Sequence, residues 1–254
     1  MFPLRDENPT LHTSFATFLI IALNAAAWIF LQGFGMNPEL AISVCRFGLI
    51  PGELLGIVPP GTQVPMGREI SCVIDGSASW LTVFSSMFMH GGWLHLIGNM
   101  WFLYLFGDNV EDAMGPVRFV VFYLICGVAA VAAQMISNPA SPIPMVGASG
   151  AIGGVMGAYV LLYPRAPVHV LVFFGFFITR IVVPAYFMLG FWFLLQVIEG
   201  IFTLGAPGGG VAFWAHIGGF LAGVVLVREF CVAGRLKGCR QKRGSTKGII
   251  RRIR

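Results

Sequence analysis

The sequence predicts an all-α protein, a polytopic bundle of six transmembrane helices. Of its 254 residues, 57% are hydrophobic and 11% are charged, whereas a soluble domain carries about 25% charged residues. A chain with so little polar surface is expected to have lipid as its solvent. Its apolar residues also gather in runs close to the roughly 17–25 residues that a membrane-spanning helix needs.

Five of these runs are long enough by themselves, and one is short. The short run, 93–106, is expected to extend upstream through 81–89 and downstream towards Val110. The other expected spans are 14–34, 116–136, 146–163, 182–204 and 211–227. The predicted organisation is a short N-terminal segment, 1–13, a membrane domain, 14–231, and a basic tail, 232–254.

The positions of Lys and Arg predict the orientation, because loops on the cytoplasmic side carry an excess of both. Six spans leave both termini on one side, and 14 of the 16 Lys and Arg residues fall there. Only Arg46 and Arg68 fall on the other side. Both termini are therefore expected in the cytoplasm. No Arg- and Ser-rich transit segment precedes the first span, which favours a bacterial plasma membrane.

The tail is interpreted as a topology anchor that also touches anionic lipid headgroups. Binding of a partner is the other interpretation. No fold motif for nucleic acid accompanies the basic residues, so nucleic acid is not an expected partner.

Two connecting segments are unusual. Residues 35–80 form a long outer loop that contains Cys45 and Cys72. An oxidising compartment would allow a disulfide between them, and the sequence does not decide whether it forms. Residues 165–180 are apolar between two arginines and are expected to form a loop at the inner membrane surface.

Polar side chains inside spans are costly, so they mark candidate functional positions. Asn24, Gln134 and Gln196 are scattered among the spans, and the rest of the set consists of His90, His95, Asn99, Ser149 and His216. The second, fourth and sixth spans all enter the membrane from outside, and these residues fall near the start of each. The topology therefore brings a hydroxyl, imidazoles and an amide to one depth.

Glycines predict how the fourth and sixth helices meet. Ser149, Gly153 and Gly157 recur every four residues and share one face, as do His216 and its following glycines at 219 and 223. Small residues at this spacing let helices pack closely. If these faces meet, Ser149 lies opposite His216. Helix packing alone is the competing interpretation of the glycines.

A serine facing a histidine is a nucleophile facing a general base. Glu199 is the acid well inside a span, but a dyad without a third acidic member is favoured. His95 and Asn99, four residues apart on one face, can add N–H donors for an oxyanion to those of the Ser149 helix start. A zinc site built from histidines lacks a His-Glu-x-x-His motif, so no metal or other cofactor is expected.

Three motifs resemble those of the rhomboid family of intramembrane serine proteases, in its bacterial type. They are His90-Gly-Gly-Trp-Leu-His95-Leu-Ile-Gly-Asn99, Gly147-Ala-Ser149-Gly150 and Ala215-His216-Ile-Gly-Gly219. Their order, their spacing and the number of spans all match. The resemblance implies a six-helix rhomboid bundle that cleaves transmembrane proteins near the outer membrane boundary.

The resemblance also implies a role for each residue. Ser149 is expected to be the nucleophile and His216 the general base. His95 and Asn99 are expected in the oxyanion hole. His90, Gly147 and Gly150 support the site, and Glu111 corresponds to a structural acid. One departure is Gly153, where some members carry an aromatic ring that stacks on the base, so His216 needs packing or another ring to position it.

Two other functions compete with a protease. A catalytically inactive rhomboid-like protein would bind membrane clients without cutting them, but such relatives usually lack the serine or the histidine. A transporter or channel would need a polar path across the whole bilayer, and the inner halves of these spans contain none. The sequence predicts no oligomeric state.

Overall fold

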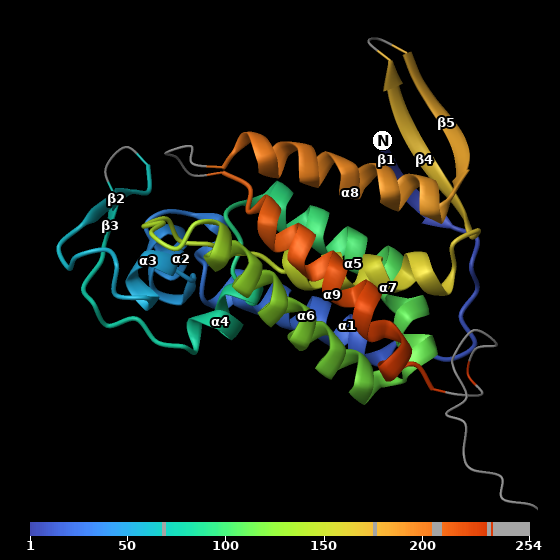
Figure 1. The fold of residues 1–254 in the computed structure, drawn as a ribbon, viewed down its shortest axis with the longest axis horizontal. Helices are drawn as coiled ribbons and strands as arrows, with labels where there is room; N and C mark the ends of the chain where they lie inside the picture. Colours follow the sequence, from blue (N-terminus) through green and yellow to red (C-terminus); the bar gives the residue numbers. More distant parts are fainter. Residues whose placement is uncertain (68–69, 175–176, 205–209, 233–234, 236–254) are drawn as a thin grey trace, which may run out of the picture.

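A computed structural model describes residues 1–67, 70–174, 177–204, 210–232 and 235. Almost all of the expected basic tail, 232–254, therefore lies outside the described residues. Six helices form the body of the molecule (Figure 1). They are α1 (Phe15–Phe30), α5 (Trp93–Met114), α6 (Pro116–Ser137), α7 (Ser149–Leu162), α8 (Ala185–Phe202) and α9 (Phe213–Phe230).

Three of these helices, α6, α8 and α9, are long and apolar enough to cross a membrane, and α1 and α7 are shorter apolar helices. The helix α5 has 22 residues, with Asp108, Glu111 and Asp112 near its end. The chain is a multi-pass membrane protein. The full count of six spans stays a prediction.

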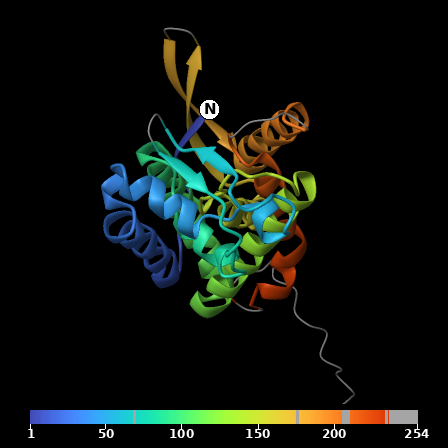
Figure 2. The same ribbon diagram turned by 90° about the vertical axis from the view of Figure 1, so that its left-hand side faces the viewer.

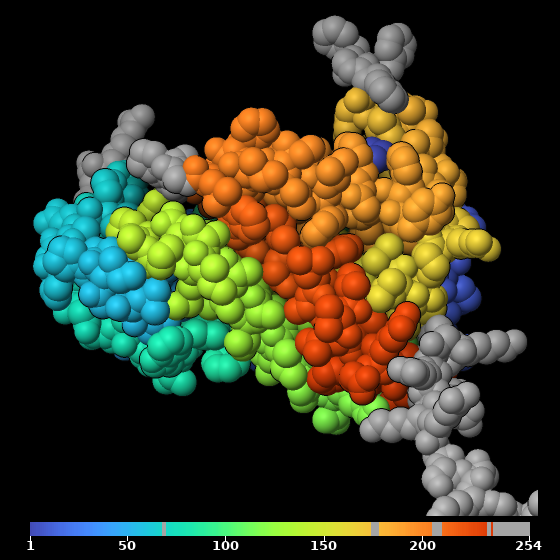
Figure 3. Space-filling view, in the orientation of Figure 1, coloured from blue at the N-terminus to red at the C-terminus, as the bar shows by residue number. Residues whose placement is uncertain are grey.

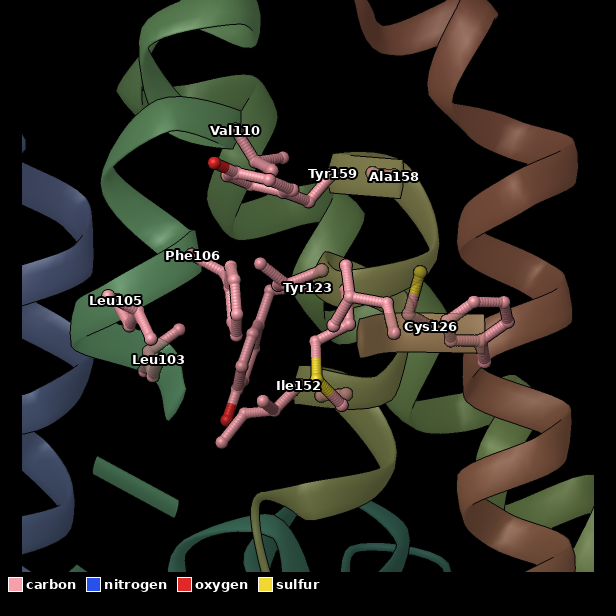
Figure 4. Close-up of a cluster of buried hydrophobic side chains, with 14 of the residues drawn as sticks. Leu103, Leu105, Phe106, Val110, Tyr123, Cys126, Ile152, Ala158 and Tyr159 are labelled. Atoms are coloured by element: carbon pink, nitrogen blue, oxygen red, sulfur yellow. The ribbon is translucent and has the colours of Figure 1, made fainter. Parts of the chain in front are cut away.

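The helix α7 lies at the centre of the bundle. Its ten residues from Gly150 to Tyr159 are all buried, because small side chains let neighbouring helices surround it. Figure 4 shows Phe106 of α5, Tyr123 of α6 and Tyr159 of α7 gathered in one apolar cluster, with Phe106 and Tyr159 ring centroids 4.9 Å apart. This central position gives the first turn of α7 a rigid support.

The backbones of α7 and α9 touch through glycines. A Cβ atom at Gly219 would overlap the carbonyl oxygen of Gly150, and one at Gly223 would overlap that of Gly154. A Cβ at Gly153 would lie 3.0 Å from the carbonyl oxygen of His216. The two glycine faces expected from the sequence therefore meet in the structure.

The second expected span is wrong at its upstream end, whereas the helix does extend downstream through Val110 as expected. Its upstream part forms two separate short elements, α4 (Thr82–Ser85) and η2 (Ser86–Phe88), and α5 begins only at Trp93. Gly91 and Gly92 precede this start, and glycine weakens a helix interior. At the other end α5 continues to Met114, where Gly115 adopts a positive φ of 81° before α6 begins at Pro116.

Two small sheets depart from the all-α expectation, although the chain is mostly helical. The segment 165–180 is not an irregular loop but most of a hairpin of β4 (Pro167–Phe174) and β5 (Phe177–Pro184). It projects away from the helices (Figure 2). Val168, Val170 and Val172 are buried, and this alternation of β-branched residues is typical of a strand. Its place at the membrane surface stays a prediction.

The N-terminal segment is also ordered. Strand β1 (Phe2–Asp6) pairs with β4, and Trp101 Nε1 of α5 donates to the carbonyl oxygen of Pro3 at 2.8 Å. Next along the chain, the buried carboxylate of Glu111 accepts from the backbone N–H groups of Ala16 and Thr17 at 2.8 and 2.7 Å. It therefore satisfies free donors at the start of α1, a structural position like the one the resemblance implies.

The long outer loop is folded at the opposite end of the bundle. Its elements are η1 (Gly33–Gly35), α2 (Glu39–Phe47), α3 (Pro51–Leu54), β2 (Gln63–Pro65) and β3 (Ser71–Val73). Strands β2 and β3 pair in an antiparallel hairpin. A disulfide joins Cys45 to Cys72, the pairing that the sequence left open, and it ties α2 to β3.

Candidate active site

Ser149 and His216 lie together near one end of the contact between α7 and α9. Ser149 is the first residue of α7, and His216 lies in the first turn of α9. Ser149 Oγ and His216 Nε2 are 2.8 Å apart, within hydrogen-bonding distance. The glycine contacts between the two helix backbones hold this pair at its distance.

The other ring nitrogen of His216 has a partner that the sequence did not identify. Its Nδ1 lies 2.7 Å from Oε1 of Gln196 on α8. The ring of Trp192, one turn earlier on α8, lies 5.8 Å from the imidazole between centroids, tilted by 35°. The Trp192 ring therefore lies against His216, where Gly153 provides no aromatic ring of its own. Glu199 is exposed, farther along α8.

His95 approaches Ser149 from α5. Its Nδ1 accepts from the backbone N–H of Gly91 at 3.3 Å, so in a neutral ring Nε2 carries the proton. A Cβ atom at Gly147 would lie 2.7 Å from that Nε2 and 3.5 Å from Ser149 Oγ. Gly147 has a positive φ of 127°, and it leaves room for the imidazole beside the serine.

Asn99 lies one turn after His95, and its side-chain Nδ2 is buried without a hydrogen-bond partner in the described part of the chain. Together with His95, Ser149 and His216 it lines a cavity of about 570 Å³ that Trp192 also borders. An unpaired buried donor is costly. Its presence at this cavity indicates that Nδ2 donates a hydrogen bond to a bound molecule or to water.

His90 is fully buried behind His95, with the two ring centroids 5.1 Å apart. Its ring nitrogens have no hydrogen-bond partner among the described residues. Its backbone is held by Gln32, which accepts from the His90 N–H at 2.9 Å and donates to its carbonyl oxygen at 2.7 Å. Sequence reasoning missed Gln32, which lies just beyond α1.

Gly150 serves packing. A Cβ atom there would lie 2.6 Å from the Cβ of Ala130 on α6. In the described part of the chain, no group of three or more His, Cys, Asp or Glu side chains is arranged to hold a metal ion.

Comparison with known proteins gives the family. The Rhomboid domain matches residues 77–232, which include every residue of the candidate site except Gln32. The chain belongs to the rhomboid family.

Individual relatives of this rhomboid are distant. Rhomboid-like protein 11, chloroplastic, of Arabidopsis thaliana is 34% identical over 153 residues, or 59% of this chain and 52% of that protein. Rhomboid protease GluP of Bacillus subtilis is 33% identical over 168 residues, or 65% and 29%. Putative rhomboid protease YdcA, also of Bacillus subtilis, is 29% identical over 143 residues, or 56% and 60%. This rhomboid therefore spans less than two thirds of the length of these relatives.

Proposed function

We propose that this rhomboid is an intramembrane serine endopeptidase that hydrolyses peptide bonds of transmembrane proteins near the outer membrane boundary. The observation that carries the proposal is the 2.8 Å contact between Ser149 Oγ and His216 Nε2, beside a cavity of about 570 Å³. Membership of a family that includes proteins named as rhomboid proteases supports it.

The first chemical step forms an acyl-enzyme. His216 Nε2 takes the proton of Ser149 Oγ as that oxygen attacks the substrate carbonyl carbon. The resulting imidazolium then gives the proton to the leaving amine, and the C–N bond breaks. In the second step a water molecule loses a proton to His216 and attacks the ester carbon. The imidazolium then returns that proton to Ser149 Oγ as the C–O bond breaks, and the new carboxylic acid is released. Atoms and charge balance without a cofactor.

The negative charge on the carbonyl oxygen needs donors in fixed positions. In our proposal these are Nε2–H of His95, Nδ2–H of Asn99 and the backbone N–H of Ser149. The last is free because the first N–H groups of a helix have no partner within it. His90 supports this hole by packing against His95. Gly147 lets His95 lie close to Ser149, and Gly150 lets α7 pack closely against α6.

The test is cleavage of a single-span substrate by the full chain in proteoliposomes, together with labelling by a fluorophosphonate probe. We expect Ser149→Ala and His216→Ala to abolish cleavage, and Ser149→Ala to abolish labelling. Ser137→Ala is the matched control, because its hydroxyl donates to the backbone carbonyl of Gln134 at the end of α6. It should cleave like the wild type.

Two results would contradict the proposal. Cleavage that survives Ser149→Ala would assign the activity to another group. A wild-type protein that is neither labelled nor active, but retains bound membrane proteins, would instead be a catalytically inactive client-binding rhomboid.

A further inference from the structure

We propose that Gln196 is a positioning residue that keeps His216 in the one neutral form able to accept the Ser149 proton. The inference rests on the proposed function and extends it to α8, a helix that carries none of the groups proposed above for the reaction. Three observations support it: the contacts of the amide, those of the imidazole and the packing of α8.

The amide of Gln196 has a fixed direction. Its Nε2 donates to the backbone carbonyl of Trp192, one turn earlier on α8, at 3.4 Å. A side-chain amide has one oxygen acceptor and one nitrogen donor, so this bond turns Oε1 towards His216. The 2.7 Å distance from Oε1 to His216 Nδ1 is then a hydrogen bond that the imidazole donates.

This direction decides the chemistry of His216. A neutral imidazole carries one N–H, and the other nitrogen is an acceptor. If Nδ1–H donates to Gln196, the lone pair of Nε2 points at Ser149 Oγ, 2.8 Å away. The opposite form would present an N–H to the serine, which could not then give up its proton. When Nε2 is protonated, Oε1 still accepts from Nδ1–H and stabilises the imidazolium.

The position of α8 controls this arrangement. The helix forms a ridge on the outside of the bundle, beside α9 (Figure 3). The ring of Phe193 stacks on Phe220 of α9 with centroids 4.6 Å apart, and Trp192 lies over His216. An outward movement of α8 would remove both the acceptor and the ring from the base. The ability of His216 to act as the base therefore depends on α8 staying packed against α9.

The experiment compares Gln196→Leu, Gln196→Glu and Phe193→Leu in the full chain. Gln196→Leu keeps the bulk but loses the acceptor, and Gln196→Glu keeps an acceptor oxygen. Phe193→Leu is the matched control, since it removes the ring that stacks on Phe220 but keeps an apolar side chain between α8 and α9 and leaves Gln196 in place. The readouts are the rate of fluorophosphonate labelling of Ser149, and kcat and KM for a single-span substrate.

We expect Gln196→Leu to lower kcat and the labelling rate about 10- to 100-fold, as for loss of a hydrogen bond to a charged group, with KM unchanged. Gln196→Glu should restore most of the labelling rate. Phe193→Leu should leave kcat and the labelling rate near those of the wild type, because α8 stays packed against α9.

Three results overturn the inference. The first is Gln196→Leu labelled at the wild-type rate, and the second is Gln196→Glu labelled no faster than Gln196→Leu. The third is Phe193→Leu matching Gln196→Leu in every readout, which would leave Gln196 a packing role only. In all three the wild type is still labelled, so the proposed function survives. An unlabelled, inactive wild type would remove the proposed function and this inference together.

Discussion

Asn99 offers a residue-level test that separates catalysis from stability. Its Nδ2 is buried at the cavity without a partner among the described residues. Losing one oxyanion donor costs about 100- to 1000-fold in kcat, so we expect a loss of that order in Asn99→Ala. The apparent melting temperature of Asn99→Ala should stay near that of the wild type, because the substitution removes no observed hydrogen bond of Nδ2. Substrate cleavage and thermal unfolding in detergent measure the two effects.

Asn24 provides the matched control for this variant. It is also buried, in α1, and its Nδ2 donates to the backbone carbonyl of Ile20 at 2.8 Å. We expect Asn24→Ala to retain activity and to lose some stability. If Asn99→Ala were fully active, or lost activity only by unfolding, Asn99 would not be an oxyanion donor.

The sequence identified site residues that belong to a recognisable motif. It did not identify residues whose role depends on how a second helix packs against the motif. Ser149 and His216 could be paired because glycine spacing predicted which helix faces meet. Gln196 appeared only as one polar residue in a span, since its role depends on how α8 is rotated against α9. Gln32 was missed for a similar reason, because it acts on the backbone of residue 90, far along the chain.

At the level of elements, the contact between α7 and α9 is tested by Gly223→Ala. The new methyl group would overlap the Gly154 carbonyl oxygen, a backbone atom that cannot turn aside. Overpacking of this kind typically costs about 1–3 kcal/mol. We expect a lower melting temperature and slower cleavage, because the helices separate and the contact between Ser149 and His216 lengthens.

Gly190→Ala is the control for this prediction. Gly190 lies within α8, and a Cβ atom there would meet no heavy atom within 4 Å. Alanine is favoured over glycine in a helix by up to about 1 kcal/mol, so this variant should be as stable as the wild type or more so. Equal melting temperatures for the two alanine variants would show that the backbone contact tolerates a methyl group.

Hydropathy explains why the helices were predicted more accurately than the connections. A long apolar run predicts a span whether or not its neighbours are known. In 165–180 the same apolar character hid a period of two, with Val168, Val170 and Val172 on the buried face. The break before α5 lies in the gap between the runs 81–89 and 93–106, and it was taken as part of one span because apolar residues lie on both sides of it.

For the whole molecule, two sets of residues indicate the orientation. Arg118 lies in the first turn of α6, and Arg5 and Arg180 lie in the sheet of β1, β4 and β5, all at one end of the bundle (Figure 1). The disulfide of Cys45 and Cys72 lies at the other end. Cations at the cytoplasmic side and a disulfide in an oxidising compartment give the same proposed orientation in a bacterial plasma membrane.

This orientation predicts how single cysteines react with a membrane-impermeant maleimide in intact cells. Ser77 and Thr13 are both exposed. Ser77 follows β3, the strand that the disulfide joins to α2, whereas Thr13 lies between α1 and Leu11, whose backbone N–H donates to Asp112 near the end of α5. We expect Ser77→Cys to be labelled directly, and Thr13→Cys only after the cells are permeabilised. Pro144 lines the Ser149–His216 cavity and lies beside Gly48 of the outer loop that contains the disulfide. The reverse labelling pattern would contradict this orientation. It would place the cavity on the cytoplasmic side, so that cleavage would occur at the inner boundary of the membrane.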